Sequence, residues 1–464
     1  MRQLIFILML AGAGWGGQSH PSTATADTLK KYITDCSPED TIYLPDGNYH
    51  IDTVINITKG ISIFGSNCVA CTLSNYIDST LYPSYIRRNI FRYSPADYNS
   101  NHRFELRGIT FNLRSKGAGI TIGSSSKDAP FKQQTKIIIQ HCSFINDTTD
   151  NYQGIWNYGG CNGVVSHCYF GLAYPIRNSP QVSNGTWWNN FIYLQGVDGG
   201  DSNNLYFEDN VFEKIRDGTS SSGILMDGQF SGRYVFRYNT VVPDQNMFGL
   251  LDLHGNQPSG YSCFGAEIYG NRIIAGSHLI QLLGQRGGKA KVFFNKIIGS
   301  NSSITNLREE FYDSISPTTS LQPQHVSESY YWNNRDYDND LLSPYVSGDS
   351  LNYGGNVGWV PQKDRDYYYQ VTAFDGSTGC GCGTYEEMIT IASPDSGVGF
   401  WVTSQGCDSI NVMVHTGADA QPIRGELYVY NKYSWIKIYE PYTYPNPLVG
   451  GIKNMKMNIK RGVR

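Results

Sequence analysis

The sequence has few charged side chains, and their signs nearly cancel. Asp, Glu, Lys and Arg make up 16% of its 464 residues, and the formal net charge is −4. A chain with so little net charge has no general electrostatic attraction to nucleic acid or to an anionic membrane surface. The composition therefore predicts no nucleic-acid partner.

A hydrophobic run long enough to span a membrane is also missing. The one pronounced run, residues 4–13, follows Arg2 and is too short to cross a bilayer. A basic start, a short apolar stretch and small residues at 24–26, or earlier at 11–13, are typical of a secretory signal peptide. We therefore expect a signal peptide over residues 1–26 and a secreted protein, extracellular or periplasmic.

A third absence concerns the segments between the repeated strands: none has helical spacing of apolar residues long enough for a crossover helix, and the repeats themselves show strand-like alternation. Four stretches share one pattern: an alternating apolar run, an Asn, one residue and another apolar residue. The Asn residues are Asn210, Asn239, Asn271 and Asn295. They recur at intervals of roughly 24 to 32 residues, a period typical of repeat architectures. Strands that repeat without helices or hairpin turns predict a coil stacked on itself, in which each Asn amide hydrogen-bonds its neighbours at a corner.

The predicted fold class is all-β, a parallel β-helix over residues 27–310 whose first residues cap the N-terminal end. Residues 311–395 are rich in Tyr and Asn, which predicts a long loop and covering segment. Strand character returns over residues 396–448. We expect these residues to cap the C-terminal side, because an open end would expose an unpaired strand edge. Residues 449–464 form a basic tail.

Ten cysteines in an exported chain make disulfides possible. Cys142 and Cys168 hold the same place in successive repeats, which predicts either a bridge between coils or a stacked pair of buried thiols. Cys380, Cys382 and Cys407 form an incomplete zinc pattern. A loop disulfide is the favoured interpretation of this second group.

A closing phrase connects the chain to a known group of proteins. Residues 440–448 read Glu-Pro-Tyr-Thr-Tyr-Pro-Asn-Pro-Leu, and residues 399–406 and 425–435 extend the match. Together with the repeats, they resemble secreted bacterial right-handed parallel β-helix proteins of the pectate-lyase-like superfamily. In that group the closing phrase usually has His where this chain has Asn446. The resemblance implies a right-handed coil over most of the mature chain, and it assigns no activity beyond the pectate-lyase-like character of the group.

A polar residue ends the third strand that we expect in each coil. The column consists of Asn157, Asn178, Asp198, Asp227, Asp252, Gln281 and Asn306. Strand alternation places this column on the outer face, and stacked strands lie about 4.8 Å apart. Carboxylates on consecutive coils repel one another, so we expect one of them to hold a proton or the row to share a cation.

Hydrolysis of a glycosidic bond is one use for such a row. Inverting glycosidases need two carboxyl groups roughly 6.5–9.5 Å apart, one to give a proton and one to activate water. The order of acids, His and Arg along the chain resembles that of polygalacturonase-type glycosidases, although none of their motifs is intact. The predicted catalytic residues are Asp198, Asp227, Asp252, His254 and Arg286.

Eliminative cleavage of a uronic-acid polymer is the other use. A calcium ion held by the acids neutralises the substrate carboxylate and acidifies the neighbouring C–H bond. A Lys or Arg then removes that proton. The predicted metal ligands are Asp198, Asp201 and Asp227, and the candidate bases are Arg286, Lys289 and Arg308. The predicted substrate-binding residues are Lys289, Arg308 and Trp332, the last by stacking on a sugar ring.

Structural interpretations stand beside these chemical ones. Asp and Asn at solenoid corners often cap turns, His254 can be a corner hydrogen-bonder, Arg286 a solvated turn residue, and Trp332 a packing residue. For the whole chain, the sequence predicts a protein that acts on an acidic polysaccharide, as a glycoside hydrolase or a calcium-dependent lyase. The alternative is a non-catalytic secreted surface or matrix protein that binds glycan. The oligomeric state stays open.

Overall fold

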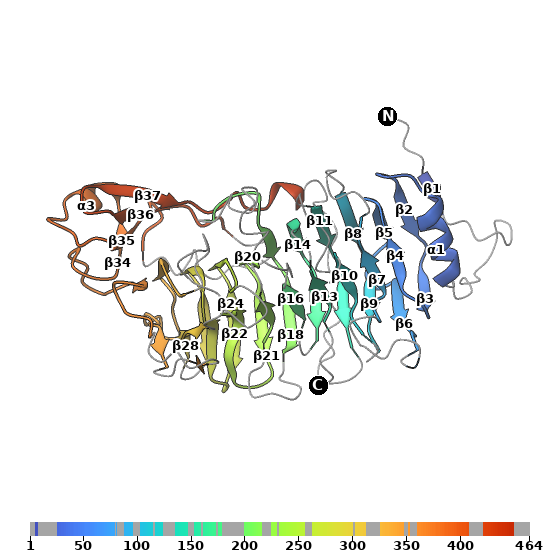
Figure 1. Cartoon of the computed structure of the whole chain (residues 1–464), viewed down its shortest axis with the longest axis horizontal. Helices are drawn as coiled ribbons and strands as arrows, with labels where there is room; N and C mark the ends of the chain where they lie inside the picture. Colours follow the sequence, from blue (N-terminus) through green and yellow to red (C-terminus); the bar gives the residue numbers. More distant parts are fainter. Residues whose placement is uncertain are drawn as a thin grey trace.

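Three long parallel sheets form the walls of an elongated coil in the computed structural model (Figure 1). The chain passes from one sheet to the next and back to the first, so each circuit adds a strand to every wall. This arrangement confirms the predicted all-β parallel β-helix. The structure describes residues 5–7, 26–78, 80, 88–95, 103–114, 117–123, 135–146, 153–158, 161–172, 175–178, 199–215, 224–229, 232–255, 262–299, 302–311, 325–347, 351–352, 360–407 and 421–449.

We name the walls sheets A, B and C; they contain twelve, nine and ten strands. Sheet A consists of β1 (Ile5–Ile7), β2 (Thr41–Leu44), β5 (Ser62–Gly65), β8 (Arg103–Arg107), β11 (Thr135–Gln140), β14 (Cys161–Ser166), β17 (Leu205–Glu208), β20 (Arg233–Arg237), β23 (Gly265–Tyr269), β26 (Lys289–Phe293), β30 (Ser329–Trp332) and β33 (Tyr367–Tyr369). Sheet B consists of β3 (Gly47–Ile51), β6 (Cys71–Asn75), β9 (Thr110–Asn112), β12 (Ser143–Ile145), β15 (Tyr169–Gly171), β18 (Val211–Ile215), β21 (Thr240–Pro243), β24 (Arg272–Gly276) and β27 (Lys296–Gly299). Sheet C consists of β4 (Ile55–Ile57), β7 (Phe91–Tyr93), β10 (Ile120–Ile122), β13 (Ile155–Asn157), β16 (Ile176–Asn178), β19 (Met226–Gly228), β22 (Met247–Leu253), β25 (Ile280–Gln285), β28 (Ser303–Leu307) and β31 (Tyr345–Val346).

Alternation along each strand sends one set of side chains into the coil. In β20, Tyr234 and Phe236 belong to the inner core, whereas Val235 between them faces a second cluster outside sheet A. Equivalent positions pile up from coil to coil, so that the ring of Phe144 stacks 4.9 Å from that of Phe111 and 4.8 Å from that of Phe170. The core is therefore built from columns that repeat at the strand spacing.

The predicted asparagine ladder lies at the corner between sheets A and B. Asn239 accepts hydrogen bonds at Oδ1 from the backbone N–H and the amide of Asn210, at 3.0 Å each. Its own amide donates to Phe207 O at 2.9 Å and to Asn271 Oδ1 at 3.1 Å. The residue before each ladder position has a positive φ, 58° at Asp209 for example. This local turn points the amide into the corner, where backbone groups need partners.

Two cysteines extend the same ladder toward the N-terminus. Asn210 Oδ1 accepts the backbone N–H of Cys168 at 2.9 Å, and the strands that follow Cys142 and Cys168 pair in register. Both thiols are free and buried. Of the two predicted alternatives, the stacked pair of thiols is therefore confirmed.

Both ends of the coil are covered. Helix α1 (Ala26–Asp35) buries Leu29 and Ile33 against the first coils. At the other end lies a four-stranded sheet of β34 (Cys380–Gly383), β35 (Gly399–Val402), β36 (Glu426–Tyr430) and β37 (Trp435–Tyr439), with helix α3 (Tyr385–Ile389) (Figure 1). A disulfide joins Cys382 to Cys407, which confirms the predicted loop disulfide. Among the described residues, no helix is both long and apolar enough to cross a bilayer.

The closing phrase runs back along the outside of sheet A (Figure 1). We call residues 440–449 the strap; it ends in the short helix η4 (Pro447–Val449), which contacts β11 and β14. Arg237 and Glu208, both fully buried, form an ion pair beneath it. Arg237 donates to the carbonyl oxygens of Tyr442 and Thr443 at 2.7 and 2.9 Å, and the backbone N–H of Asn446 donates to Glu208 at 2.9 Å. The strap is therefore held by a charge pair of sheet A.

Replacement of Asn239 by Ala should lower the free energy of unfolding by about 2–4 kcal/mol, because buried backbone and amide groups on both sides lose their partners. The expected change is measured by urea denaturation. Asn56→Ala, at an exposed position of β4, is the control and should change stability by less than about 0.5 kcal/mol. Equal stability of the two variants would contradict a structural role of the ladder.

Arg237→Ala should cost about 3–5 kcal/mol of stability, because it leaves Glu208 charged and buried without its partner. It should also release the strap, which limited proteolysis after residue 439 would detect. Arg365, whose side chain is 45% exposed beside Asp366, provides the control. Arg365→Ala should cost no more than about 1 kcal/mol of stability. Cleavage of the strap at the same rate in both variants would contradict the role of Arg237 in holding it.

Candidate functional site

The register of sheet C decides which polar residues share a column. Arg177 pairs with Asp227, Asp227 with Asp252, Asp252 with Gly284, and Gly284 with Asn306. Asp227, Asp252 and Asn306 therefore occupy one row, as predicted. Asp198 lies outside the described residues.

The remaining members of the predicted column are displaced from this row. Asn157 and Asn178 are in register with each other and with Gly228, one residue beyond Asp227. Gln281 pairs with Phe248 because the register shifts within β22 before Asp252. A one-residue offset moves a side chain to the opposite face of a strand, so the prediction was wrong for Asn157. Gln281 lies level with Phe248, which is 48% exposed, and therefore earlier along the strand than Asp252.

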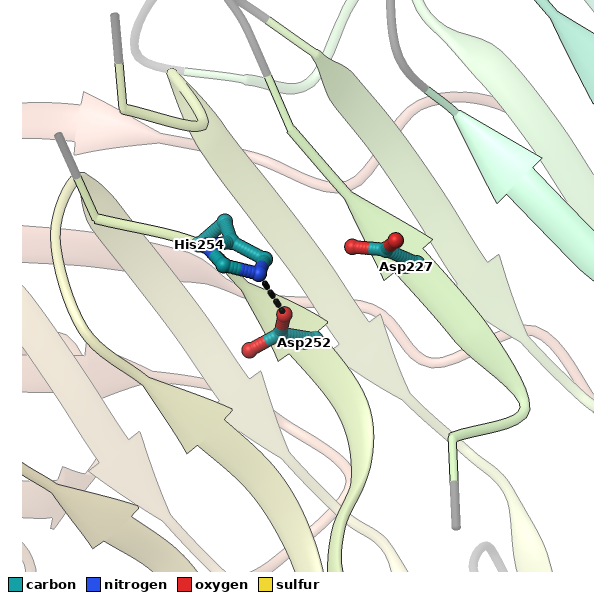
Figure 2. Close-up of side chains that lie close together, drawn as sticks. All are labelled: Asp227, Asp252 and His254. Carbon is teal, nitrogen blue, oxygen red and sulfur yellow. Dashed lines mark ion pairs between the residues drawn. The ribbon is translucent and has the colours of Figure 1, made fainter. Parts of the chain in front are cut away.

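Asp227, Asp252 and His254 come together where the neighbouring strands β19 and β22 of sheet C end (Figure 2). Each offers a ligand atom, and these atoms lie within 4.8 Å of one another. The strand pattern explains the placement, since Met226, Leu251 and Leu253 enter the core and leave the Asp side chains outside. The backbone of His254 is held by its N–H, which donates to Gly228 O at 2.9 Å. Its Nε2 lies 3.6 Å from Asp252 Oδ2.

Arg286 joins this cluster from the next coil. Its Nε donates to Asp252 Oδ1 at 3.2 Å, and its Nη2 pairs with the second oxygen of the same carboxylate. Glu310, in the short strand β29 (Glu310–Phe311) that pairs with β32 (Leu351–Asn352), lies 2.6 Å from Arg286 Nη1 and 3.0 Å from His254 Nδ1. Sequence reasoning missed Glu310, because it lies beyond the third strand of its coil and outside the aligned column. Its neighbour Arg308 was the nearest available signal.

The other side of Asp227 is also occupied by polar groups. Gln229 Nε2 donates to Asp227 Oδ2 at 2.8 Å, and Arg177 Nε lies 3.7 Å from the same oxygen. The guanidinium of Arg177 stands 4.8 Å from the ring centroid of Trp156 and is 22% exposed. Arg177 is therefore a partly accessible cation beside a predicted catalytic acid, and it was not among the predicted site residues.

Burial dominates the electrostatics of the cluster. Asp227, Asp252 and His254 are 5%, 3% and 9% exposed. Burial raises the pKa of Asp252, while the positive charge of Arg286 and the neighbouring His254 oppose that rise. Burial also works against the charge of Arg286, yet Asp252 and Glu310 keep its pKa raised. The cluster thus holds a carboxyl group with an elevated pKa next to a permanent cation.

The donor set fits calcium poorly. Calcium prefers six to eight oxygen ligands, whereas here one of the three candidate ligands is a His nitrogen and Arg286 engages both oxygens of Asp252. Asp201 lies in the turn before strand β17 of sheet A, where its carboxylate accepts the backbone N–H of Asn203 at 2.8 Å. The predicted metal set of Asp198, Asp201 and Asp227 is therefore not assembled among the described residues.

The predicted substrate-binding residues lie at different places. Lys289 begins a strand of sheet A and pairs with Glu328 at 2.6 Å. Trp332 is 1% exposed and stacks 4.3 Å from the ring of Phe293, so its indole has no face available for a sugar. Arg308 is half-buried at the corner after β28, and its backbone N–H donates to Gln285 O at 3.1 Å. Of the three, only Arg308 is on the coil corner that carries Arg286.

Comparisons with known proteins add little to this picture. No known protein family matches the sequence. No curated protein matches it either. Among solved structures, ORF18 of Geobacillus virus E2 is similar with a TM-score of 0.34 and 13% identity, over 60% of this chain and 56% of that chain. The chain thus spans little more than half the length of that protein.

Glu309 presents a separate, pH-sensitive group beside the cluster. It is 1% exposed; its Oε1 accepts the backbone N–H of Val326 at 2.9 Å, and its Oε2 lies 3.6 Å from His325 Nδ1. Burial raises the pKa of Glu309 to about 7, although the contact with His325 opposes the rise. Asp366 and Arg365 also face this carboxyl group.

Because the folded state holds the Glu309 proton more tightly than the unfolded state, its contribution to stability is complete below the unfolded pKa. That contribution should be lost as the pH rises through the window that ends near 7. Glu309→Gln should remove this loss, which is on the order of a few kcal/mol. Urea denaturation at a series of pH values measures it. Glu328→Gln, at a 62% exposed side chain, is the control, and identical pH slopes for Glu309→Gln and the parent protein would disprove the assignment.

Proposed function

We propose that this protein is exported and hydrolyses a glycosidic bond in an acidic polysaccharide, with Asp227 and Asp252 as the reacting carboxyl groups. The observation that carries the proposal is their direct pairing on adjacent coils, with ligand atoms of both and of His254 within 4.8 Å. Two carboxyl groups that flank one bond are the machinery of most glycosidases. Fold similarity is not part of this reasoning, since one fold hosts many functions.

The two acids have different surroundings, which suggests different roles. Asp252, whose pKa is raised by burial, is the general acid that protonates the leaving oxygen. Arg286 positions this carboxyl group through both of its oxygens, so one of the two contacts must open before Asp252 delivers its proton to the leaving oxygen. Asp227, oriented by Gln229, is the second reacting carboxyl group. Their short separation is nearer the roughly 5–5.5 Å of retaining enzymes than the inverting spacing, so we assign Asp227 as a nucleophile.

Arg177 accounts for the preference for an acidic substrate. Its guanidinium lies beside Asp227, stacks on Trp156 and is partly exposed. A planar cation of this kind pairs with the carboxylate of a uronic acid. We assign no step to calcium, because the acids that would bind it are engaged by Arg286 and Gln229.

A non-catalytic secreted glycan-binding or matrix protein is the second candidate. The deep burial of Asp227 and Asp252 favours it, since buried charges that are fully paired also occur as structural networks. In that case the cluster stabilises the corner of sheet C, and the coil binds glycan along its surface without cleaving it.

Asp227→Asn and Asp252→Asn should each lower the rate of polymer cleavage by at least about 100-fold, because each removes a proton-transfer or nucleophilic group. The assay is release of reducing ends from polygalacturonate and other uronic-acid polymers, with ultraviolet absorbance to detect unsaturated products of elimination. Addition of a chelator should leave the rate unchanged. Asp201→Asn, in the turn before strand β17, is the matched control.

Full cleavage by both variants, with native circular dichroism spectra, would refute the catalytic roles. A parent protein that cleaves none of these polymers, together with variants that lose stability, would support the second candidate. Chelator-sensitive release of unsaturated products would instead indicate a metal-dependent polysaccharide lyase.

A further inference from the structure

A polar cleft of about 650 Å³ opens between the last coil and the C-terminal sheet. Its lining includes Asp364 and Tyr368 from the coil, Ser393 and Asp395 from the segment before β35, and Tyr430 and Lys432 from the hairpin between β36 and β37. This volume lies within the range typical of small-molecule sites. The C-terminal sheet is at the end of the coil, whereas the carboxylate cluster belongs to sheet C (Figure 1).

Backbone hydrogen bonds hold the walls of the cleft together. Gly397 N–H donates to Tyr430 O at 2.8 Å, and Tyr430 N–H donates to Val398 O at 3.1 Å. Asp395 N–H donates to Gly376 O at 2.8 Å. The carboxylate of Asp364 accepts the backbone N–H of Gly379 at 2.7 Å, which ties the coil to the segment before β34. The cleft is therefore formed before any ligand binds.

Three lining residues adopt a backbone conformation that L-amino acids rarely use. The φ angles are 61° at Asp364, 53° at Ser393 and 80° at Lys432. Such conformations cost about 1–3 kcal/mol each and gather at functional sites. Lys432 belongs to the turn of the β36–β37 hairpin, so these angles describe how tight turns shape the walls of the cleft.

The groups that reach the cleft are those that bind a hydroxyl-rich ligand. Within the described part of the chain, the side chains of Ser393, Asp395 and Lys432 make no hydrogen bond or ion pair, and all three residues are exposed. They offer a hydroxyl, an acceptor and a donor. Tyr430, half-buried, packs 5.4 Å from Trp435 and adds an aromatic surface. Mixed hydrogen-bonding groups around an aromatic ring suit the polar edges and apolar faces of sugars.

Charge selects among sugars. Asp364 is balanced by Lys363, 3.9 Å away, and Asp395 faces the opposite charge of Lys432 across the lining, so the cleft has no excess positive charge to attract uronic acids or phosphates. We propose that the cleft between the last coil and the C-terminal sheet binds a neutral oligosaccharide. This site is separate from the proposed catalytic cluster, and it would tether the protein to a neutral glycan while the coil meets an acidic one.

Calorimetric titration of the purified mature protein tests the proposal. The probes are hexasaccharides of cellulose, xylan, mannan and laminarin, with a galacturonic acid hexamer for comparison. At least one neutral probe should bind, and more tightly than the galacturonic acid hexamer. Tyr430→Ala and, separately, Asp395→Ala should each weaken that binding by roughly five- to tenfold. Asp395 is exposed and makes no side-chain contact to the described residues, so its variant tests the site without disturbing the hairpin.

Two controls distinguish binding in this cleft from binding elsewhere on the surface and at the proposed catalytic cluster. Tyr345→Ala removes a 54% exposed tyrosine from β31 of sheet C and should leave binding unchanged. Asp227→Asn should also leave it unchanged, so a failure of the catalytic proposal would not affect this one. The proposal is overturned if no neutral probe binds, if the galacturonic acid hexamer binds more tightly, or if Asp395→Ala and Tyr430→Ala both bind as the parent does.

Discussion

Everything in this molecule depends on the register between successive coils. Parallel strands about 4.8 Å apart place each residue on top of its equivalent in the next circuit. The arrangement makes every interaction repeat, whether it is favourable or costly. Phenylalanine rings stack on one another inside sheet B, and asparagine amides hydrogen-bond in a row at the corner beside it. The ladder removes the cost of burying the turn backbone, because each amide serves the coil on either side.

The same register brings like charges together. Asp227 and Asp252 would repel each other at this spacing. Cationic side chains from the neighbouring coils offset this repulsion. Arg286 engages Asp252, and Arg177 approaches Asp227. An arrangement of this kind serves equally as a stabilising network and as a catalytic pair, because both need carboxyl groups held in fixed positions. The different surroundings of the two acids favour the catalytic interpretation. The pKa of Asp252 is raised, whereas Asp227 is hydrogen-bonded to Gln229.

The C-terminal region covers the outside of sheet A. The strap packs on the outside of sheet A over Glu208 and Arg237, and the aromatic cluster outside that sheet buries Trp332. The carboxylate cluster belongs to sheet C, on a different wall. The strap starts from a small sheet that also forms one side of the polar cleft. The closing phrase and the sheet before it therefore cover one surface and help to form another.

The amino-acid sequence by itself determined the parallel β-helix, the asparagine ladder and the presence of a loop disulfide among Cys380, Cys382 and Cys407, and the structure decided that Cys382 pairs with Cys407. These follow from period and spacing, which are local properties of the chain. It also placed Asp227 and Asp252 in one row. Only the tertiary structure decided three other features. Asn157 and Gln281 are displaced from the row of Asp227 and Asp252, Glu310 contacts His254, and Trp332 is buried. A register shift of one residue and a strap that returns along the coil both depend on contacts between residues far apart in the sequence. No local pattern of residues predicts which residues these contacts bring together.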